Sequence, residues 1–308
     1  YIRTCAMSGL LPMSDGLQAT GQHAAAGSQG QERGFGCPKD GVRRGPDRVV
    51  TTFRQYSWHA YDSISYLCRS KLNRKEKTMT IGIINAMQKE HEQLAALLED
   101  RQVETRGRFS FTTGTYGGRR LVLMQSGIGK VNAAVGAVEL IHHYAPTVLV
   151  NTGVAGGIDA SLGVMDVVAG ATVAYHDVDC GPENKPGQVQ GLPPAFAADE
   201  RLLGIASSLT TSTRIVPGLI CSGDQFITDP ATLQTIKQRF PEALAVDMES
   251  GALAQVCHLY HIPFLSFRII SDTPGVENHF DQYLNFWDTM ADRSFSVTKA
   301  LLEAVSKF

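Results

Sequence analysis

Acidic side chains follow the hydrophobic runs of this sequence at the points where the runs end. Asp247 and Glu249 come directly after the apolar stretch "ALAV", and Asp272 closes the run "PFLSFRIISD". Glu90 lies one helical turn beyond the first such stretch, "TIGIINAM". In open α/β sheets, ligands bind at the carboxyl ends of the strands. The sequence therefore predicts that these carboxylates converge on one rim of a sheet, where a site would be built.

Each of these acids also has a purely structural interpretation. An aspartate at a strand end, such as Asp272, often caps a helix or forms a turn. Glu90 is expected in the first turns of a helix, where the macrodipole favours any negative charge, and Glu92 has the same setting. The residues alone leave both interpretations open and do not choose between Glu90 and Glu92.

Predicted strands and helices alternate along most of the chain. Short apolar runs predict strands, and a Gly-Gly turn predicts a hairpin over residues 109–127. One helix is predicted over 229–241, with Asp229 as its N-cap and Pro230 in its first turn. The alternation is typical of an α/β fold with a central, largely buried sheet. The other helices are predicted over 88–100, 130–144, 199–209, 249–261 and from 281 to the end.

Composition excludes several classes of partner. The chain has 308 residues, 43% of them hydrophobic, and a formal net charge of -2, so no global charge favours nucleic acid or an anionic membrane. No apolar run reaches the roughly 18–20 residues that would span a bilayer. The six cysteines are scattered and form no C-x-x-C pair, so zinc spacing is absent. This pattern indicates reduced thiols and a cytoplasmic protein.

Residues 1–78 differ from the rest of the chain. They are rich in Gly, Gln, Ser and Arg, and they are net basic, whereas the remainder is net acidic. We expect a disordered or non-native N-terminal extension, such as upstream read-through, with an Arg-rich targeting segment as the alternative. Met79 is expected to begin a single catalytic domain that covers residues 79–308.

Two glycine-rich loops do not match the nucleotide-binding motifs that they suggest. "SGIGKVN" (126–132) fails the P-loop pattern, because one residue separates its glycines and Val131 follows Lys130. "NTGVAGGID" (151–159) does not match the dinucleotide fingerprint. Each loop is either a tight turn or a place where the backbone approaches a small ligand closely.

Seven segments in one order carry a family resemblance: "IGIINAMQKE", "SGIGKVNAA", "NTGVAGG", "YHDVD", "SGDQFI", "AVDMESGALAQVCH" and "FRIISD". From Met79 to Phe308 the chain closely resembles the 5′-methylthioadenosine/S-adenosylhomocysteine nucleosidases of the purine nucleoside phosphorylase superfamily. The resemblance implies a three-layer α/β/α sandwich with a central mixed sheet, and a homodimer. It also implies hydrolysis of the N-glycosidic bond of 5′-thio-adenosines, without a metal or an organic cofactor.

The resemblance gives the carboxylates distinct roles. Asp272 matches the acid that serves the adenine ring nitrogen N7, and Ser271 beside it would orient that carboxyl. Glu90 matches the carboxylate that activates water, a choice that only the register of "IGIINAM" makes. Glu249 matches the carboxylate that accepts hydrogen bonds from the ribose hydroxyls.

Other matched positions would shape the substrate pocket. Met248 would lie against the sugar, and Arg268 would hold the water and the nearby acids, although its charge also neutralises them. Adenine would be held by main-chain groups after "SGD", with Phe226 stacking on the ring and Ile227 beside it. The apolar walls for a 5′-alkylthio group are expected from Met87, Ile128, Phe280 and Leu284.

The chain departs from the family pattern at two of these positions. Asp247 stands where a glutamate is common, which keeps the charge and shortens its reach. Val154 stands where a serine is common, which removes one polar contact near the ligand. Residues 180–194, which correspond to a wall supplied by the partner subunit, contain no aromatic residue.

Three rival functions remain at the level of sequence. A nucleoside phosphorylase would use phosphate in place of water, but Glu90 would repel an anion there. A futalosine-type nucleosidase would differ only in the 5′ substituent, and a non-catalytic binding protein would bind nucleosides without cleaving them. Release of adenine separates the last class from the enzymes.

Overall fold

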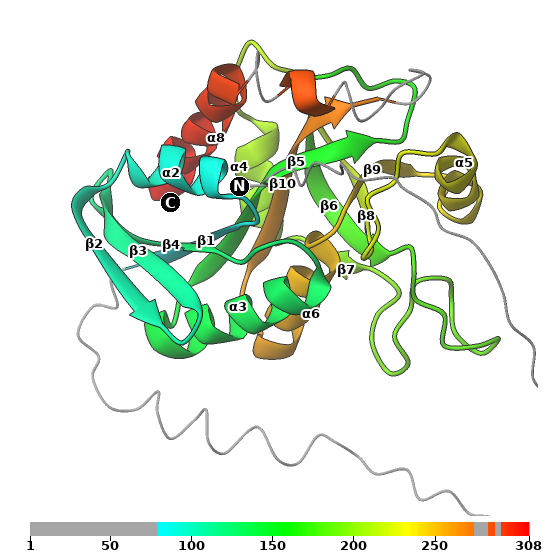
Figure 1. Cartoon of the computed structure of the whole chain (residues 1–308), viewed down its shortest axis with the longest axis horizontal. Coiled ribbons are helices and arrows are strands. Elements are labelled where there is room, and N and C mark those ends of the chain that lie inside the picture. Colours follow the sequence, from blue (N-terminus) through cyan, green and yellow to red (C-terminus); the bar gives the residue numbers. More distant parts are fainter. Residues whose placement is uncertain (1–78, 274–282, 287–290, 308) are drawn as a thin grey trace, which may run out of the picture. The chain divides into compact units, whose positions relative to one another are not determined.

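The computed structural model describes residues 79–273, 283–286 and 291–307 (Figure 1). The predicted N-terminal extension and Phe280 lie outside these ranges. No helix of the described part of the chain is long and apolar enough to cross a membrane.

One mixed sheet forms the centre of the fold, as the sequence predicts. Its strand order is β10-β6-β8-β9-β5-β1-β4-β3-β2, with β7 paired to β6. The strands joined to β1 are parallel to it, whereas β2, β3 and β4 form an antiparallel meander. The strand bounds are β1 Thr80–Asn85, β2 Glu99–Arg106, β3 Phe109–Tyr116, β4 Arg119–Gln125, β5 Val148–Gly157, β6 Val167–Tyr175, β7 Phe196–Ala197, β8 Ile215–Ser222, β9 Ala243–Asp247 and β10 Phe264–Asp272.

Strand β5 closes part of the sheet into a ring. It pairs along its length with β10, and its last two residues pair with β9. Because β10, β6, β8 and β9 are also joined in that order, these strands and β5 form a closed circuit. Gly156 of β5 is paired with both Asp272 and Val246. The ends of β9 and β10 therefore meet at one point.

Helices cover both faces of the sheet in Figure 1. Helices α3 and α6 pack against each other on one face, while α8 contacts α2 and α4 on the other. Their bounds are α2 Gln88–Ala95, α3 Lys130–Tyr144, α4 Glu200–Ser207, α5 Pro230–Arg239, α6 Ser250–Tyr260 and α8 Ala291–Ser306. The predicted cap of α5 is confirmed, because the Asp229 carboxylate accepts a hydrogen bond from the Thr232 amide at 2.8 Å.

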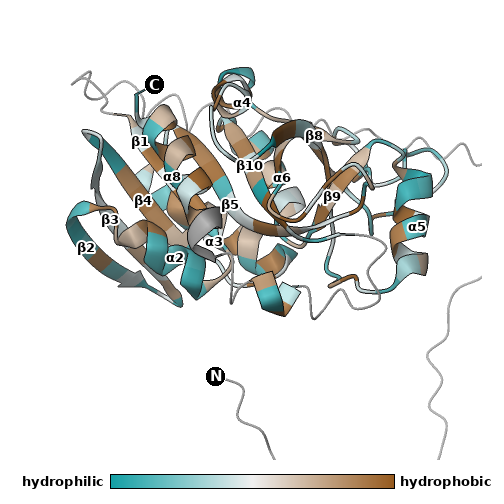
Figure 2. Cartoon of the chain, turned by 90° about the horizontal axis from the view of Figure 1, so that it is seen from above, coloured by the Kyte–Doolittle hydropathy of each residue, from teal (hydrophilic) through white to brown (hydrophobic). Residues whose placement is uncertain are grey.

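Alternating side chains divide the core between the two faces. In β4, Leu121 and Leu123 pack in the cluster under α2, α4 and α8, whereas Val122 and Met124 pack in the cluster under α3 and α6. Successive side chains of a strand point to opposite faces, so a strand that is buried on both faces reads as a continuous apolar run. This accounts for the hydrophobic stripe of central strands in Figure 2.

The prediction was wrong around the end of the first helix. Helix α2 ends at Ala95, and residues 99–106 form the edge strand β2, which the sequence interpretation missed. Every residue of β2 is exposed, so no apolar pattern marks it. Its backbone pairs with β3 across the turn at Gly107, which has a φ of 57°. The strand is therefore held by ladder hydrogen bonds rather than by a buried face.

Candidate active site

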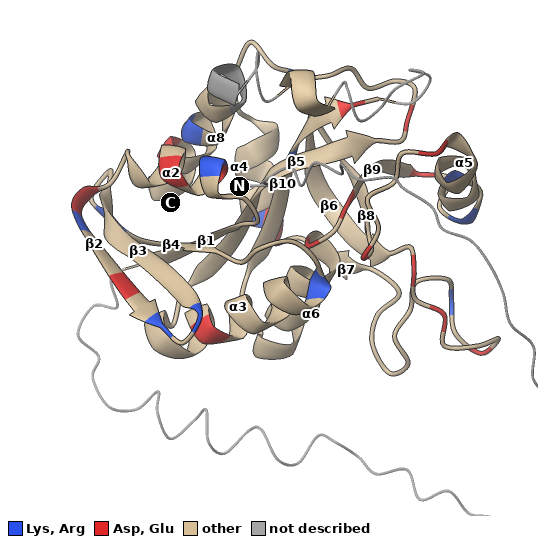
Figure 3. Cartoon of the chain, in the orientation of Figure 1, with Lys and Arg blue, Asp and Glu red and all other residues tan. Residues whose placement is uncertain are grey.

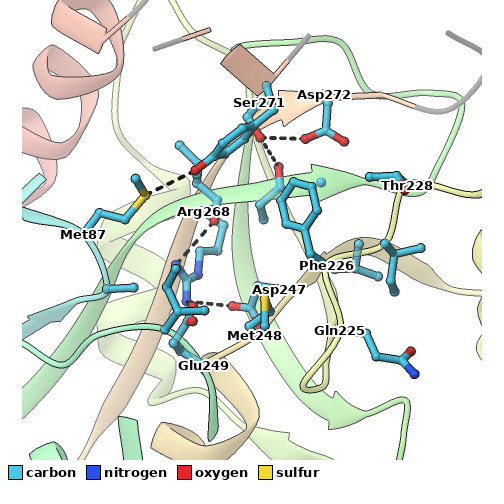
Figure 4. A pocket seen from close by; sticks show the side chains of 18 of the residues that line it. Met87, Gln225, Phe226, Thr228, Asp247, Met248, Glu249, Arg268, Ser271 and Asp272 are labelled. Carbon is cyan, nitrogen blue, oxygen red and sulfur yellow. Dashed lines mark hydrogen bonds and ion pairs between the residues drawn. The ribbon is translucent and has the colours of Figure 1, made fainter. Parts of the chain in front are cut away.

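A cavity lies where the ends of β9 and β10 meet the loops after β1 and β8 (Figure 4). The predicted site residues within the described ranges line it with one exception, Leu284. Figure 3 shows acidic residues at the ends of β9 and β10. Residues that the sequence interpretation did not assign also line it, among them Thr228 and Tyr283. The lining residues from the predicted set are Met87, Glu90, Ile128, Val154, Phe226, Ile227, Asp247, Met248, Glu249, Arg268, Ser271 and Asp272.

Arg268 is the buried centre of the carboxylate cluster. Its side chain is 1% exposed, and its Nη2 lies 2.8 Å from Asp247 Oδ2 and 3.3 Å from Glu249 Oε2. The same nitrogen donates to Asn151 Oδ1 at 2.6 Å. A buried charge is tolerated only when it is paired and hydrogen-bonded. Arg268 on β10 thus makes it feasible to hold several acids around one cavity.

The Asp247 carboxylate is held by hydrogen bonds and an ion pair to other protein groups. Besides its ion pair with Arg268, it accepts hydrogen bonds from the Ser250 amide, at 3.2 Å, and from the Ser250 hydroxyl. The first of these bonds gives a partner to the Ser250 amide, which lies at the start of α6 and has no partner within the helix. The aspartate that replaces the expected glutamate therefore still reaches Arg268.

Glu249 reaches the cavity from the residue before α6. Its Oε1 accepts a hydrogen bond from the Gly129 amide at 3.0 Å, and Arg268 faces its other oxygen. Burial raises the pKa of Glu249, Arg268 opposes that shift, and the nearby charge of Asp247 adds to it. A carboxylate in this position can accept hydrogen bonds from ligand hydroxyls.

Two aspartates hold the loop that presents Gly129 to Glu249. The Lys130 amide donates to Asp224 at 2.7 Å, and the Lys130 ammonium pairs with Asp177 at 2.8 Å. Gly129 has a φ of 95°, a conformation that favours glycine. The loop "SGIGKVN" thus brings its backbone close to the Glu249 carboxylate.

Glu90 faces the cavity from the first turn of α2. Its two oxygens accept hydrogen bonds from the amides of Met87 and Val154, each at 3.2 Å. Burial raises the pKa of Glu90 to about 7, with Arg268 acting in the opposite direction. A carboxyl that titrates near neutrality is suited to act as a general base.

Gly153 makes the approach of Glu90 and Arg268 feasible. It has a φ of 149°, and a Cβ there would lie 2.7 Å from Arg268 Nη1 and 2.8 Å from Glu90 Oε1. Such contacts are closer than van der Waals packing permits. Gly153, the first glycine of "NTGVAGG", therefore leaves the space that these two side chains fill.

Asp272 lies at the opposite side of the cluster, at the end of β10. It is 8% exposed, and its Oδ1 accepts a hydrogen bond from the Ser271 hydroxyl at 2.7 Å. Ser271 has one hydroxyl proton, and Ala155 O lies farther away, at 3.3 Å. Ser271 therefore fixes the orientation of the Asp272 carboxyl.

Aromatic and sulfur-containing side chains form the apolar side of the cavity. The rings of Phe226 and Tyr283 meet edge to face with centroids 5.4 Å apart, and the Tyr283 hydroxyl contacts Met87 Sδ at 3.4 Å. Sequence reasoning expected Leu284 in this wall, but Leu284 is exposed and the lining residue is its neighbour Tyr283. Which of these two neighbours faces the cavity depends on the rotation of the helical segment 283–286 about its axis, and no sequence motif indicates that rotation.

Comparisons with known proteins agree with this arrangement. A model of the phosphorylase superfamily matches residues 80–303. The 5′-methylthioadenosine/S-adenosylhomocysteine nucleosidase of Bacillus subtilis (strain 168) is 43% identical over 212 residues, which are 67% of this chain and 92% of that protein. The chain belongs to this nucleosidase family.

Solved structures of the family share the fold. The nucleosidase from Neisseria meningitidis, in complex with methylthio-immucillin-A, is 37% identical and has a TM-score of 0.69 over 73% of this chain and 99% of that chain. The nucleosidase from Colwellia psychrerythraea 34H, in complex with adenine, is 35% identical with a TM-score of 0.69, covering 74% and 96% of the two chains. The α/β fold with a mixed sheet is therefore that of the nucleoside phosphorylases.

Proposed function

We propose that this nucleosidase-family chain hydrolyses the N-glycosidic bond of 5′-methylthioadenosine and S-adenosylhomocysteine, releasing adenine and a 5-thioribose. The observation that carries the proposal is the convergence of Glu90, Glu249 and Asp272 on one cavity around the buried Arg268. The relatives named for this activity span nearly the whole described domain.

Glu90 acts as the base that activates water. Cleavage of a ribosyl bond passes through an oxocarbenium-like transition state, so water must attack the anomeric carbon as the base leaves. The Met87 and Val154 amides fix the Glu90 carboxylate, and the titration of this group near neutrality lets it accept the proton. Arg268 helps to hold the water and balances the negative charge.

Asp272 acts on the leaving group. The adenine ring leaves more easily when its N7 is protonated or hydrogen-bonded, because negative charge develops on the base. Asp272 in its protonated form donates from the carboxyl that Ser271 orients. Glu90 lies in α2 and Asp272 ends β10, so the two carboxyls can act on different parts of the substrate.

Glu249 and the aromatic wall hold the rest of the substrate. Glu249 accepts hydrogen bonds from the ribose 2′ and 3′ hydroxyls, with Met248 against the sugar. Phe226 stacks on adenine, and the main chain beside Ile227 reads the edge of the base. Met87 and Ile128 face the 5′-thio group, together with Phe280, which lies outside the described residues.

Hydrolysis is favoured over phosphorolysis by the charges around the cavity. Among the described lining residues, Arg268 is the one basic side chain, and Asp247, Glu249 and Asn151 already engage it. A phosphate would need cationic or hydroxyl donors and would meet the Glu90 carboxylate. Water meets no such repulsion.

Release of free adenine from each substrate tests the proposal. Full-length protein is incubated with methylthioadenosine, S-adenosylhomocysteine, adenosine and futalosine, and the released bases are separated by chromatography. We expect adenine from the two thio-nucleosides at higher kcat/KM than from adenosine. Binding without release would favour a binding protein, and a preference for futalosine would favour the other nucleosidase class.

Several finer features accompany this proposal. The helices on the two faces of the sheet support a three-layer α/β/α sandwich. An exposed apolar stripe beside the cavity, formed by Ile128, Val131 and Val135, supports a homodimer. We place the enzyme in the cytoplasm, in line with its scattered cysteines, and in methionine salvage. It works without a metal or an organic cofactor and binds neither nucleic acid nor membranes.

A further inference from the structure

A second, smaller cavity lies beside Glu90. Its volume is about 20 Å³. A cavity needs roughly 10–15 Å³ to hold one water molecule, which also needs two to four polar partners. Polar groups are supplied by Glu90 and Gln93 of α2, Thr152 of β5 and Thr298 of α8. The cavity therefore has both the room and the chemistry for one water.

The Thr152 hydroxyl points to what the cavity holds. Thr152 is 1% exposed, and its Oγ1 has no hydrogen-bond partner within the described part of the chain. A buried hydroxyl without a partner is costly, so nearly all such groups in folded proteins bind protein or ordered water. Because Thr152 lines the same cavity as Glu90, a water there can serve both groups.

We propose that this second cavity binds a water molecule that bridges the Thr152 hydroxyl and the Glu90 carboxylate, which makes Thr152 a positioning residue for the general base. This cavity shares Glu90 and Val154 with the substrate cavity, and its other lining residues come from α2, β5, β10 and α8. The water donates a hydrogen bond to the carboxylate and accepts one from Thr152. The catalytic consequence rests on the proposed function, whereas the water site itself does not.

The bridge favours the ionised form of Glu90. Charged groups that face Glu90 are Arg268 from β10 and Glu249 from the residue before α6, with Asp247 beyond them on Arg268. Of the α8 side chains that the structure describes, Phe295 and Thr298 line this cavity, and neither of them titrates. The neighbouring His91 is bonded to Thr112 instead, at 3.0 Å. A hydrogen bond donated to a carboxylate lowers its pKa. Loss of the water is therefore expected to raise the pKa of Glu90.

Three variants of the full chain separate the hydroxyl from packing. Thr152→Val removes the hydroxyl at nearly constant shape, and Thr152→Ser keeps it. Ser306→Ala is the matched control, because Ser306 Oγ is also buried without a partner in the described chain but lies at the end of α8, outside this cavity. The dependence of kcat and KM on pH is measured for adenine release from methylthioadenosine.

We expect Thr152→Val to lower kcat about tenfold and to move the acidic limb of its pH profile up by about one pH unit, with KM little changed. Thr152→Ser and Ser306→Ala should retain the wild-type profile. A wild-type profile in Thr152→Val, or an equal loss in Thr152→Ser, would overturn the positioning role.

High-resolution crystal structures of the wild type and Thr152→Val test the site without reference to activity. We expect a water within hydrogen-bond distance of Thr152 Oγ1 and the Glu90 carboxylate in the wild type, and its loss in the variant. A dry cavity in the wild type would refute the water site. Failure of the wild type to release adenine would refute the proposed function alone.

Discussion

At the scale of single residues, the chemistry depends on carboxylates with different partners. Glu90 is held by two backbone amides, Asp272 by a serine hydroxyl, and Glu249 by Gly129 and Arg268. Burial raises the pKa of both Glu90 and Glu249, and Arg268 opposes the shift in each case. The division of labour between these groups can be tested one residue at a time.

Removal of either proton-transfer group is expected to stop turnover and spare the fold. Glu90→Gln and Asp272→Asn keep side-chain size, so we expect kcat to fall by about 10²–10⁴-fold, the usual contribution of general acid–base catalysis. Steady-state adenine release measures this, and circular dichroism checks the fold. The exposed Glu92→Gln is the matched control for Glu90, and near-normal rates in either site variant would contradict its assigned role.

The pH dependence of the reaction should report Glu90. The folded pKa of Glu90 is raised to about 7, so the active carboxylate form is lost as the pH falls through that value. We expect kcat/KM to decline on the acidic side with an apparent pKa near 7. An acidic limb centred near the ordinary carboxyl value of about 4.5 would argue against Glu90 as the base.

Sequence reasoning reached the carboxylates but not all of their surroundings. Asp247, Glu249 and Asp272 could be predicted because they end apolar runs, while the choice of Glu90 over Glu92 needed the family register. Tyr283 and Thr152 were missed for a physical reason. One is placed only by the phase of a short helical segment, and the other looks like any β-branched residue in a buried strand.

At the scale of elements, β5 determines how closely the catalytic groups can approach one another. Gly156 joins the ends of β9 and β10, and Gly153 leaves space for Glu90 and Arg268. A side chain at Gly153 would be strained by its φ of 149° as well as by contact. The geometry of the site thus depends on one strand that carries no reacting group.

Gly153→Ala is expected to damage activity far more than an ordinary glycine substitution. The added Cβ would displace Glu90 or Arg268, and misplacement of about 1 Å can cost about 10²-fold in rate. Gly204→Ala in α4 is the matched control, because no atom lies within 4 Å of its new Cβ, and it should stabilise the helix by about 0.5–1 kcal/mol. Adenine release and thermal unfolding are measured for both, and equal behaviour of the two variants would contradict the role of Gly153.

The elements were predictable where a buried face shaped the sequence. The strands β1, β4, β5 and β10 are apolar runs, and α5 carries its predicted cap. The edge strand β2 could not be predicted, because neither of its faces is buried. The ring closure at Gly156 was also invisible, since pairing of distant strands leaves no local pattern.

At the scale of the whole molecule, an apolar stripe on α3 and the loop before it connects the cavity with the surface. Ile128 is 56% exposed, Val131 73% and Val135 46%, and their spacing places them on one side of the helix start. Ile128 also lines the substrate cavity. A contiguous exposed apolar surface of this kind is typical of protein interfaces.

Val131→Lys is expected to convert the proposed homodimer into a monomer. A lysine at the centre of the stripe would place an unpaired charge in the interface. Sedimentation measures the mass, with Val103→Lys as the matched control, because Val103 is 65% exposed on β2 and lies outside the stripe. A monomeric wild type, or a Val131→Lys variant that remains dimeric, would contradict this interface.

The identity of the sugar product tests the central claim most directly. Methylthioadenosine is cleaved in phosphate-free buffer and in excess phosphate, and the products are identified by mass spectrometry. We predict adenine and free 5-methylthioribose in both buffers at the same rate, because Glu90 activates water and the described cavity offers no uncommitted cation to phosphate. Cleavage that requires phosphate and yields a sugar 1-phosphate would contradict the account.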